Sequence, residues 1–278
     1  MSVDLSHGVF VALGGGGMRG VAHLGVLSEL EAEGVRVRGI AGASSGSLLG
    51  ALWLTAGTEA GMQRVREFVT SGRARKLPDF GESGQSYGLL RKLGHAARLV
   101  RALALRHMLT TAEMLDQVAF FLPEVDIGSL RVPFLAVAAD SRSGDEVRLG
   151  SGPLREAVAA SSAMPGLVPP IPWSERLLQD GGSVAEIPVP AARSLGSPVL
   201  AVETSEGLPP FNERGDRLPR ALFRAAAMGW QALRRRLVAD ADGVIAPAVN
   251  HIHWADFNAV DEAVAAGRVA ARAFLSTC

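Results

Sequence analysis

The sequence predicts an α/β protein with a mainly parallel central sheet and helices on its faces. Apolar runs at residues 8–13 and 35–41 are each followed by a segment with apolar residues at helical spacing, which gives the order strand, helix, strand, helix. Parallel strands need a crossover of this kind, so the order favours a parallel sheet. The chain contains no repeat, linker or low-complexity tract. We therefore expect residues 1–278 to form a single domain with a substantial core.

The first elements have clear signals. Residues 8–13 are apolar without alternation, as in a strand that is buried on both faces. Residues 19–33 have helical spacing and end before Gly34, a residue type that commonly follows a helix. A second strand at 35–41 then meets the turn GASSGS, which runs into a second helix.

The later elements are predicted from the same patterns. Residues 58–121 are expected to be mainly helical, and a short strand is expected just before Asp180. The remaining strands are expected at 132–139, 146–149, 198–202 and 243–246, and the remaining helices at 154–162, 217–240 and 258–275.

Composition excludes several classes of function. Lys+Arg and Asp+Glu balance at 28 each, which gives no sign of a nucleic-acid footprint. The single cysteine, Cys278, excludes a disulfide or a cysteine-based metal site within one chain. We find no signal-peptide pattern and no apolar run of the ~20 residues that span a bilayer. These features predict a cytoplasmic protein.

Two basic stretches suit peripheral contact with an anionic membrane. One is the acid-free segment 83–112, and the other is the predicted helix with Arg220, Arg224 and Arg234 to Arg236 among apolar residues. Basic amphipathic helices of this kind lie on membrane surfaces. A solvated basic face is an equally good interpretation of both stretches.

The stretch GGGGMRG at 14–20 joins the first strand to the first helix. Gly15, Gly17 and Gly20 spell the G-x-G-x-x-G pattern of a dinucleotide-binding turn. Such a site needs an acidic residue at the end of the second strand, where residues 37–41 read VRGIA. The N–H groups of a glycine turn can instead stabilise the oxyanion of acyl transfer. We favour this second interpretation, with nucleotide binding as the alternative from another class.

The segment Gly42-Ala43-Ser44-Ser45-Gly46 fits the pattern G-x-S-x-G of a nucleophile elbow. A sharp turn between strand and helix exposes the serine hydroxyl, and the small flanking residues avoid clashes with neighbouring backbone. The pattern alone is weak, but here a predicted strand precedes it and a predicted helix follows it. Ser44 is therefore the candidate nucleophile.

A serine nucleophile needs a base. In the order serine, acid, histidine only His251 and His253 lie late enough in the chain, while His23 is better explained as a packed residue of the first helix. The stretch QDGGS offers Asp180 on a tight glycine turn. A desolvated carboxylate in that position can act as the base without an imidazole.

These motifs together resemble the patatin-like phospholipases, and most of all bacterial members related to the catalytic domain of neuropathy target esterase. The family order is G-G-G-x-R-G, G-x-S-x-G and D-G-G, and this chain reads GGGMRG at 15–20, GASSG at 42–46 and DGG at 180–182. A further family block with Pro-Gly resembles AASSAMPGLVPP, where Val168 stands in place of the family's frequent phenylalanine. The resemblance covers nearly the whole chain.

The resemblance implies a three-layer α/β/α sandwich with a mixed, mainly parallel sheet. It implies a Ser44–Asp180 dyad that hydrolyses lipid acyl esters without a metal or other cofactor. The remaining residues that it implies are the oxyanion amides of Gly15, Gly16 and Gly17, with support from Arg19, Gly42, Gly46 and Gly181.

Two alternatives to a lipid hydrolase follow from the same motifs. A short-chain carboxylesterase would use the same residues on soluble substrates. A non-catalytic or nucleotide-binding regulatory module would keep the fold and use the glycine loop alone.

Overall fold

The computed structural model describes residues 3–76, 107–205, 207–208, 211, 213 and 218–278. An eight-stranded sheet has the hydrogen-bonded order β5-β6-β3-β2-β1-β7-β8, and β4 pairs with β3. The strands are β1 Val9–Leu13, β2 Val37–Ala43, β3 Phe134–Asp140, β4 Glu146–Leu149, β5 Ile171–Trp173, β6 Arg176–Asp180, β7 Val199–Val202 and β8 Gly243–Ile245.

The sheet is mixed and mainly parallel. The pairs β1–β2, β1–β7, β2–β3 and β7–β8 are parallel, while β4, β5 and β6 make the antiparallel pairs. The helices are α1 Ala22–Ala32, α2 Ser45–Ala56, α3 Thr58–Thr70, α5 Thr111–Phe121, α6 Leu154–Ser161, α7 Gly182–Ala185, α8 Val189–Leu195, α9 Leu218–Ala239 and α10 Val260–Leu275. The 3-10 turns within the described residues are η1 Gly17–Val21, η2 Arg73–Lys76 and η3 Ile127–Ser129.

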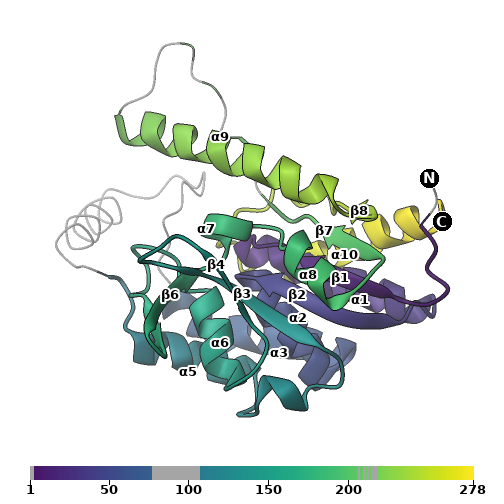
Figure 1. The fold of residues 1–278 in the computed structure, drawn as a ribbon, viewed down its shortest axis with the longest axis horizontal. Coiled ribbons are helices and arrows are strands. Elements are labelled where there is room, and N and C mark those ends of the chain that lie inside the picture. Colours follow the sequence, from purple (N-terminus) through teal and green to yellow (C-terminus); the bar gives the residue numbers. More distant parts are fainter. Residues whose placement is uncertain (1–2, 77–106, 206, 209–210, 212, 214–217) are drawn as a thin grey trace.

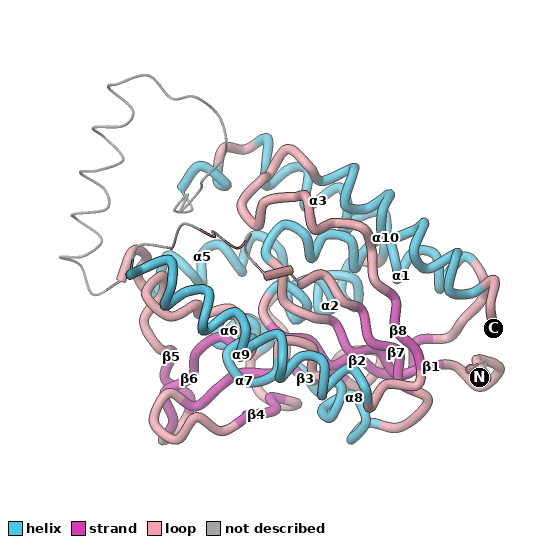
Figure 2. The backbone as a smooth tube through the Cα atoms, turned by 90° about the horizontal axis from the view of Figure 1, so that it is seen from above, coloured by secondary structure: helices cyan, strands magenta, loops and turns pink. Residues whose placement is uncertain are grey.

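Two buried hydrophobic clusters lie on opposite faces of this sheet. In β1, Val9, Val11 and Leu13 join the larger cluster with α1, α2, α3, α5, α6 and α10, while Phe10 and Ala12 join the smaller one with α8. The alternation follows from the period-two geometry of a strand. Figures 1 and 2 show the resulting layers of helices on both sides of the sheet. The predicted fold class, a three-layer α/β/α sandwich, is confirmed.

The predicted elements are present with small shifts at their ends. The partner strand at 146–149 forms as predicted and pairs antiparallel with β3. Sequence patterns missed α7 and α8, because helices of four and seven residues are too short to show a helical period. Of the segment 58–121, α3 and α5 are helical as expected, and 77–106 lies outside the described residues. No helix in the described part of the chain is long and apolar enough to cross a bilayer.

Candidate active site

Ser44 stands between the end of β2 and the start of α2, as the elbow motif predicts. Its backbone has φ 53° and ψ −124°, a positive φ that is rare for a residue with a side chain. Such strain persists only where the surrounding structure holds it, and it is common at active sites. The side chain is half-buried, and the positive end of α2 lies beside it.

Gly42 and Gly46 are required by close packing around this turn. A Cβ at Gly42 would lie 2.5 Å from the carbonyl oxygen of Gly46, and one at Gly46 would lie 2.2 Å from the carbonyl oxygen of Leu13. Both distances are shorter than real Cβ contacts. Only glycine at these two positions lets α2 begin directly against the ends of β1 and β2.

Strand β3 brings Asp180 next to Ser44. Strand β4 occupies one edge of β3, and β2 and β6 share the other. On that shared edge Ala43 of β2 is opposite Val137, and Asp180 of β6 is opposite the next residue, Ala138. Ser44 directly follows Ala43, so it lies next to Asp180 along the same side of β3.

The turn after Asp180 holds its carboxylate. Oδ1 accepts a hydrogen bond of 2.7 Å from the N–H of Gly182. A Cβ at Gly181 would lie 2.0 Å from the carbonyl oxygen of Val137, so only glycine lets this turn lie on β3. Asp180 is buried.

Ser161, at the end of α6, links Ser44 to the turn that follows Asp180. Its carbonyl accepts from the N–H of Ser44 at 3.1 Å and from the N–H of Gly181 at 3.2 Å. Its Oγ accepts from the N–H of Ser44 at 3.1 Å and donates to the carbonyl of Val137 at 2.6 Å. This serine belongs to the AASSAMPG block of the sequence, where no local signal indicates its role, because only the fold brings it to Ser44.

Burial raises the pKa of Asp180 to about 6, since desolvation disfavours the charged carboxylate. Hydrogen bonds from the Ser44 side chain and the Gly182 N–H act in the opposite direction, and the negative charge of Glu186 adds to the rise. Asp180 is therefore a stronger base than an exposed aspartate and still largely ionised at neutral pH.

The glycine loop lies against Ser44, but its amides are not equivalent. A Cβ at Gly15 would lie only 3.4 Å from the Cβ of Ser44. The N–H of Gly15, one of the three amides expected to serve an oxyanion, donates to the carbonyl of Glu186 at 2.9 Å. The N–H groups of Gly16 and Gly17, at the start of η1, have no hydrogen-bond acceptor among the residues that the structure describes.

Arg19 holds the glycine loop to two distant segments. Its guanidinium is buried and donates to the carbonyl of Thr204 at 3.2 Å and to that of Ile252 at 3.3 Å. Of the two roles that the sequence suggests, positioning of the loop or contact with substrate, these contacts support positioning.

The histidines have other partners. His23 is fully buried, and burial lowers its pKa to about 4, so its imidazole is neutral. Its Nε2 lies 2.7 Å from the carbonyl oxygen of Gly14 and so contacts the start of the glycine loop. His251 Nε2 lies 2.7 Å from Glu262, and His253 Nδ1 accepts from the N–H of Ala255. Within the described ranges none of the three has a hydrogen bond to Ser44.

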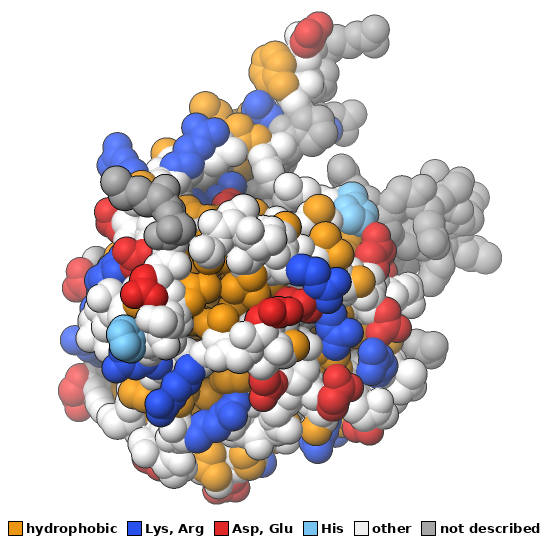
Figure 3. Space-filling model, turned by 90° about the vertical axis from the view of Figure 1, so that its right-hand side faces the viewer, with side chains coloured by type: hydrophobic (Ala, Val, Ile, Leu, Met, Phe, Trp, Pro, Cys, Tyr) orange, Lys and Arg blue, Asp and Glu red, His pale blue; other side chains and the backbone are white. Residues whose placement is uncertain are grey.

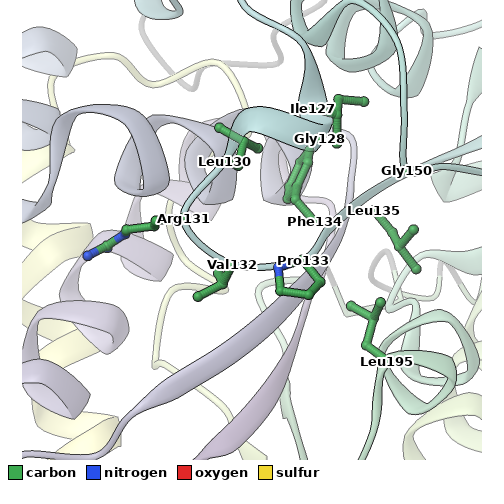
Figure 4. A pocket seen from close by; sticks show the side chains of 10 residues that line it. All are labelled: Ile127, Gly128, Leu130, Arg131, Val132, Pro133, Phe134, Leu135, Gly150 and Leu195. Carbon is green, nitrogen blue, oxygen red and sulfur yellow. The ribbon is translucent and has the colours of Figure 1, made fainter.

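The cavity of Figure 4 is not part of this site. It has a volume of about 290 Å³ and lies at the beginning of β3, beside Pro133 and Phe134. Since a strand rises about 3.3 Å per residue, Phe134 is roughly 13 Å along β3 from Ala138, which faces Asp180. The cavity therefore lies toward the end of β3 that is away from Ser44 and Asp180.

Comparison with known proteins agrees with this arrangement of motifs. A family model described as patatin-like phospholipase matches residues 11–193. An uncharacterized NTE family protein of Mycobacterium bovis is 34% identical over 184 residues, which are 65% of this chain and 44% of that protein. Patatin-like phospholipase domain-containing protein 6 of Mus musculus is 29% identical over 244 residues, which are 86% of this chain and 16% of that protein. The chain thus spans less than half the length of these curated relatives.

Among solved structures, VipD from Legionella pneumophila is similar with a TM-score of 0.47 and 16% identity, over 96% of this chain and 66% of that one.

Proposed function

The chain belongs to the patatin-like phospholipase family, and from that premise we propose that it is a serine acyl hydrolase that cleaves carboxylic ester bonds of phospholipids, lysophospholipids or related lipids. The observation that carries the proposal is the register around β3, which sets Ser44 and Asp180 side by side on one strand edge. A nucleophile in a strained turn and a desolvated carboxylate beside it are the two groups that acyl transfer requires.

In the first half-reaction the Oγ of Ser44 attacks the ester carbonyl carbon while Asp180 takes the hydroxyl proton. The tetrahedral intermediate places its negative charge on the former carbonyl oxygen. The N–H groups of Gly16 and Gly17 are the proposed donors to this oxygen, because both lie in the loop against Ser44 and neither is used elsewhere among the described residues. Collapse of the tetrahedral intermediate breaks the bond between the acyl carbon and the alcohol oxygen, and Asp180 gives its proton to the leaving alcohol.

In the second half-reaction water attacks the acyl-enzyme. Asp180 takes a proton from the water, and the bond between the acyl carbon and the Oγ of Ser44 breaks. The proton returns to Ser44 and the fatty acid leaves. Asp180 therefore acts first as base and then as acid in both halves.

We expect Ser44→Ala and Asp180→Asn each to lower the rate of ester hydrolysis by roughly 10³-fold or more, because the two groups act as a unit. The measurement is hydrolysis of p-nitrophenyl esters of increasing chain length, with circular dichroism as the check of folding. Ser45→Ala is the matched control for the serine, since its Oγ has no hydrogen-bond partner within the described part of the chain. His251→Ala and His253→Ala test the triad alternative and should keep full activity.

Full activity in Ser44→Ala, or a wild type that is inactive on every ester, would overturn the proposal and return attention to the glycine loop as a nucleotide site. A rate that rises with chain length supports a lipid substrate. A rate that is highest on the shortest ester favours a carboxylesterase with soluble substrates.

A further inference from the structure

Helix α9 presents large apolar side chains to solvent. Of the nine large hydrophobic residues that are exposed in the described part of the chain, five lie on α9. Leu222 is 62% exposed, Phe223 54% and Trp230 43%. The rings of Phe223 and Trp230 pack edge to face with their centroids 6.2 Å apart, so they form one continuous patch two turns long. An exposed apolar patch on one element marks an interaction surface.

Only some positions of α9 meet the protein. Ala227, Gln231 and Arg234 follow at helical spacing and are half-buried or buried. Among the described residues, the side chains of α9 that pack against a core cluster are Leu237 and Val238, at the end of the helix. A surface helix ordinarily buries its apolar stripe and exposes its polar one. In α9, Phe223 and Trp230 stand four residues before Ala227 and Arg234 and so lie on the same side of the helix, yet both rings are exposed.

A buried arginine anchors the second half of α9 to the body. The guanidinium of Arg234 lies 3.3 Å from the carboxylate of Glu186 and 3.0 Å from that of Glu203, and its side chain is 9% exposed. Glu186 in turn accepts the N–H of Gly15 through its main-chain carbonyl. The anchor of α9 is thus attached to the segment after Asp180 and to the glycine loop. The helix lies over the same part of the molecule as the site, as Figure 1 shows for its course beside α7 and α8.

The charge on α9 is of one sign. The helix contains no Asp or Glu and five arginines, in a protein whose formal net charge is zero. The side chains of Arg235 and Arg236 are exposed. Figure 3, which views the molecule from the side where α9 ends, shows basic and hydrophobic side chains near one another at the top of the molecule.

We propose that α9 docks on the surface of an anionic lipid layer, with Leu222, Phe223 and Trp230 inserted at the boundary between the headgroups and the acyl chains. Its exposed arginines would meet the lipid phosphates. This occupant fits both observations at once, since an apolar face calls for hydrocarbon and an acid-free basic flank calls for negative charge. Aromatic residues are also the side chains that favour the headgroup region. The choice of lipid as the partner rests on the proposed function, because a lipid hydrolase meets its substrate in such a layer.

The test measures binding without turnover. Every protein carries Ser44→Ala, so that hydrolysis does not change the vesicles. Co-sedimentation is measured with phosphatidylcholine vesicles and with vesicles of phosphatidylcholine and phosphatidylglycerol, at low and high salt. The parent is expected to bind the anionic vesicles more tightly, and to lose much of that binding at high salt.

Two sets of variants separate the apolar and the charged contributions. The triple variant Leu222→Ala, Phe223→Ala and Trp230→Ala keeps good helix formers and should bind at least tenfold more weakly. Arg235→Gln with Arg236→Gln should weaken binding to anionic vesicles by roughly tenfold, and should change binding to neutral vesicles little. The matched controls are Val269→Ala, which removes a side chain that is 65% exposed on α10, and Arg176→Gln, which removes an exposed charge on β6. Neither control should change binding.

Two results would overturn the docking proposal. One is equal vesicle binding by parent and triple variant. The other is a parent that binds no vesicles and is dimeric by light scattering, while the triple variant is monomeric. A second copy of the chain would then cover the apolar side chains of α9. Failure of the proposed function is a separate result, namely no ester hydrolysis by the wild type with vesicle binding intact. In the wild-type background, the triple variant should hydrolyse a soluble short-chain ester normally and vesicle lipid more slowly.

Discussion

At the scale of the residue, the chemistry of the proposed site depends on the environment of Asp180. Burial moves its pKa from the ordinary 3.8 to about 6. A folded-state pKa above the unfolded value means that the native state binds more protons between these two pH values, so the free energy of unfolding falls as pH rises from about 4 to about 6. The protein thus gives up stability at neutral pH and holds a carboxylate of raised basicity next to Ser44.

The same raised pKa predicts the pH dependence of hydrolysis. Asp180 must be ionised to accept a proton, so kcat/KM should fall as pH drops through about 6. Glu186→Gln removes a negative charge that raises the pKa of Asp180, and should therefore move this acid limb to lower pH. The main-chain carbonyl that accepts from Gly15 is unchanged in the variant. The measurement is a pH profile of kcat/KM on a soluble ester. An acid limb at the same pH in Glu186→Gln and wild type would contradict the assignment of this limb to Asp180.

At the scale of the element, the site is assembled where the ends of β2, β6 and α6 meet along β3. The first end contributes the proposed nucleophile Ser44 and the second the proposed base Asp180. The third contributes Ser161, whose carbonyl accepts from the N–H groups of Ser44 and Gly181. The hydrogen bonds of Ser161 are made to backbone groups of two other elements, so they fix positions and not chemistry. We regard Ser161 as a positioning residue.

Ser161→Ala should lower kcat on a soluble ester while KM changes little, because Ser44 loses one partner of its N–H and shifts within the elbow. The free energy of unfolding should fall by about 1–3 kcal/mol, since the carbonyl of Val137 loses its buried donor. Ser194→Ala is the matched control, because its Oγ also donates to a main-chain carbonyl, that of Ala191, but within α8. Kinetics together with urea denaturation separates the two roles. A variant that is destabilised with an unchanged kcat would show that Ser161 is structural only.

At the scale of the whole molecule, the chain closes by packing its last helix on its first. Helices α1 and α10 approach so closely that a Cβ at Gly25 would lie 2.1 Å from the carbonyl oxygen of Val264, and one at Gly267 would lie 2.1 Å from that of Ala22. Figure 2 shows the two helices side by side. Because η1 and α1 follow the glycine loop directly, this contact also supports the loop beside Ser44.

Gly267→Ala should lower the free energy of unfolding by about 1–3 kcal/mol, because the added methyl group forces α10 away from α1. Gly229→Ala is the control within α9, where a Cβ would meet nothing within 4 Å. There the same substitution should raise the free energy of unfolding by about 0.5–1 kcal/mol through helix propensity. Urea midpoints measure both. Equal effects of the two substitutions would contradict the close α1–α10 packing.

Much of the fold and some of the site could be read from the sequence. Strands buried on both faces, the elbow at Ser44 and the glycine turn at Asp180 have local signals, because period, turn residues and small-residue spacing act over a few positions. All the strands except the three-residue β5 were therefore predicted within a few residues, and the family was recognised from three short motifs. The short helices α7 and α8 carry no such local signal.

What only the tertiary structure decided concerns groups that are far apart in the chain. The register of β3 brings Ser44 to Asp180, and the same packing gives the Gly15 amide to Glu186 and leaves those of Gly16 and Gly17 for the proposed oxyanion. The sequence marked α9 as basic and amphipathic, but not which of its faces meets the body. A helical period records only that two faces differ. Which face is buried depends on the partners that the rest of the chain supplies, here Glu186 and Glu203 for the buried Arg234.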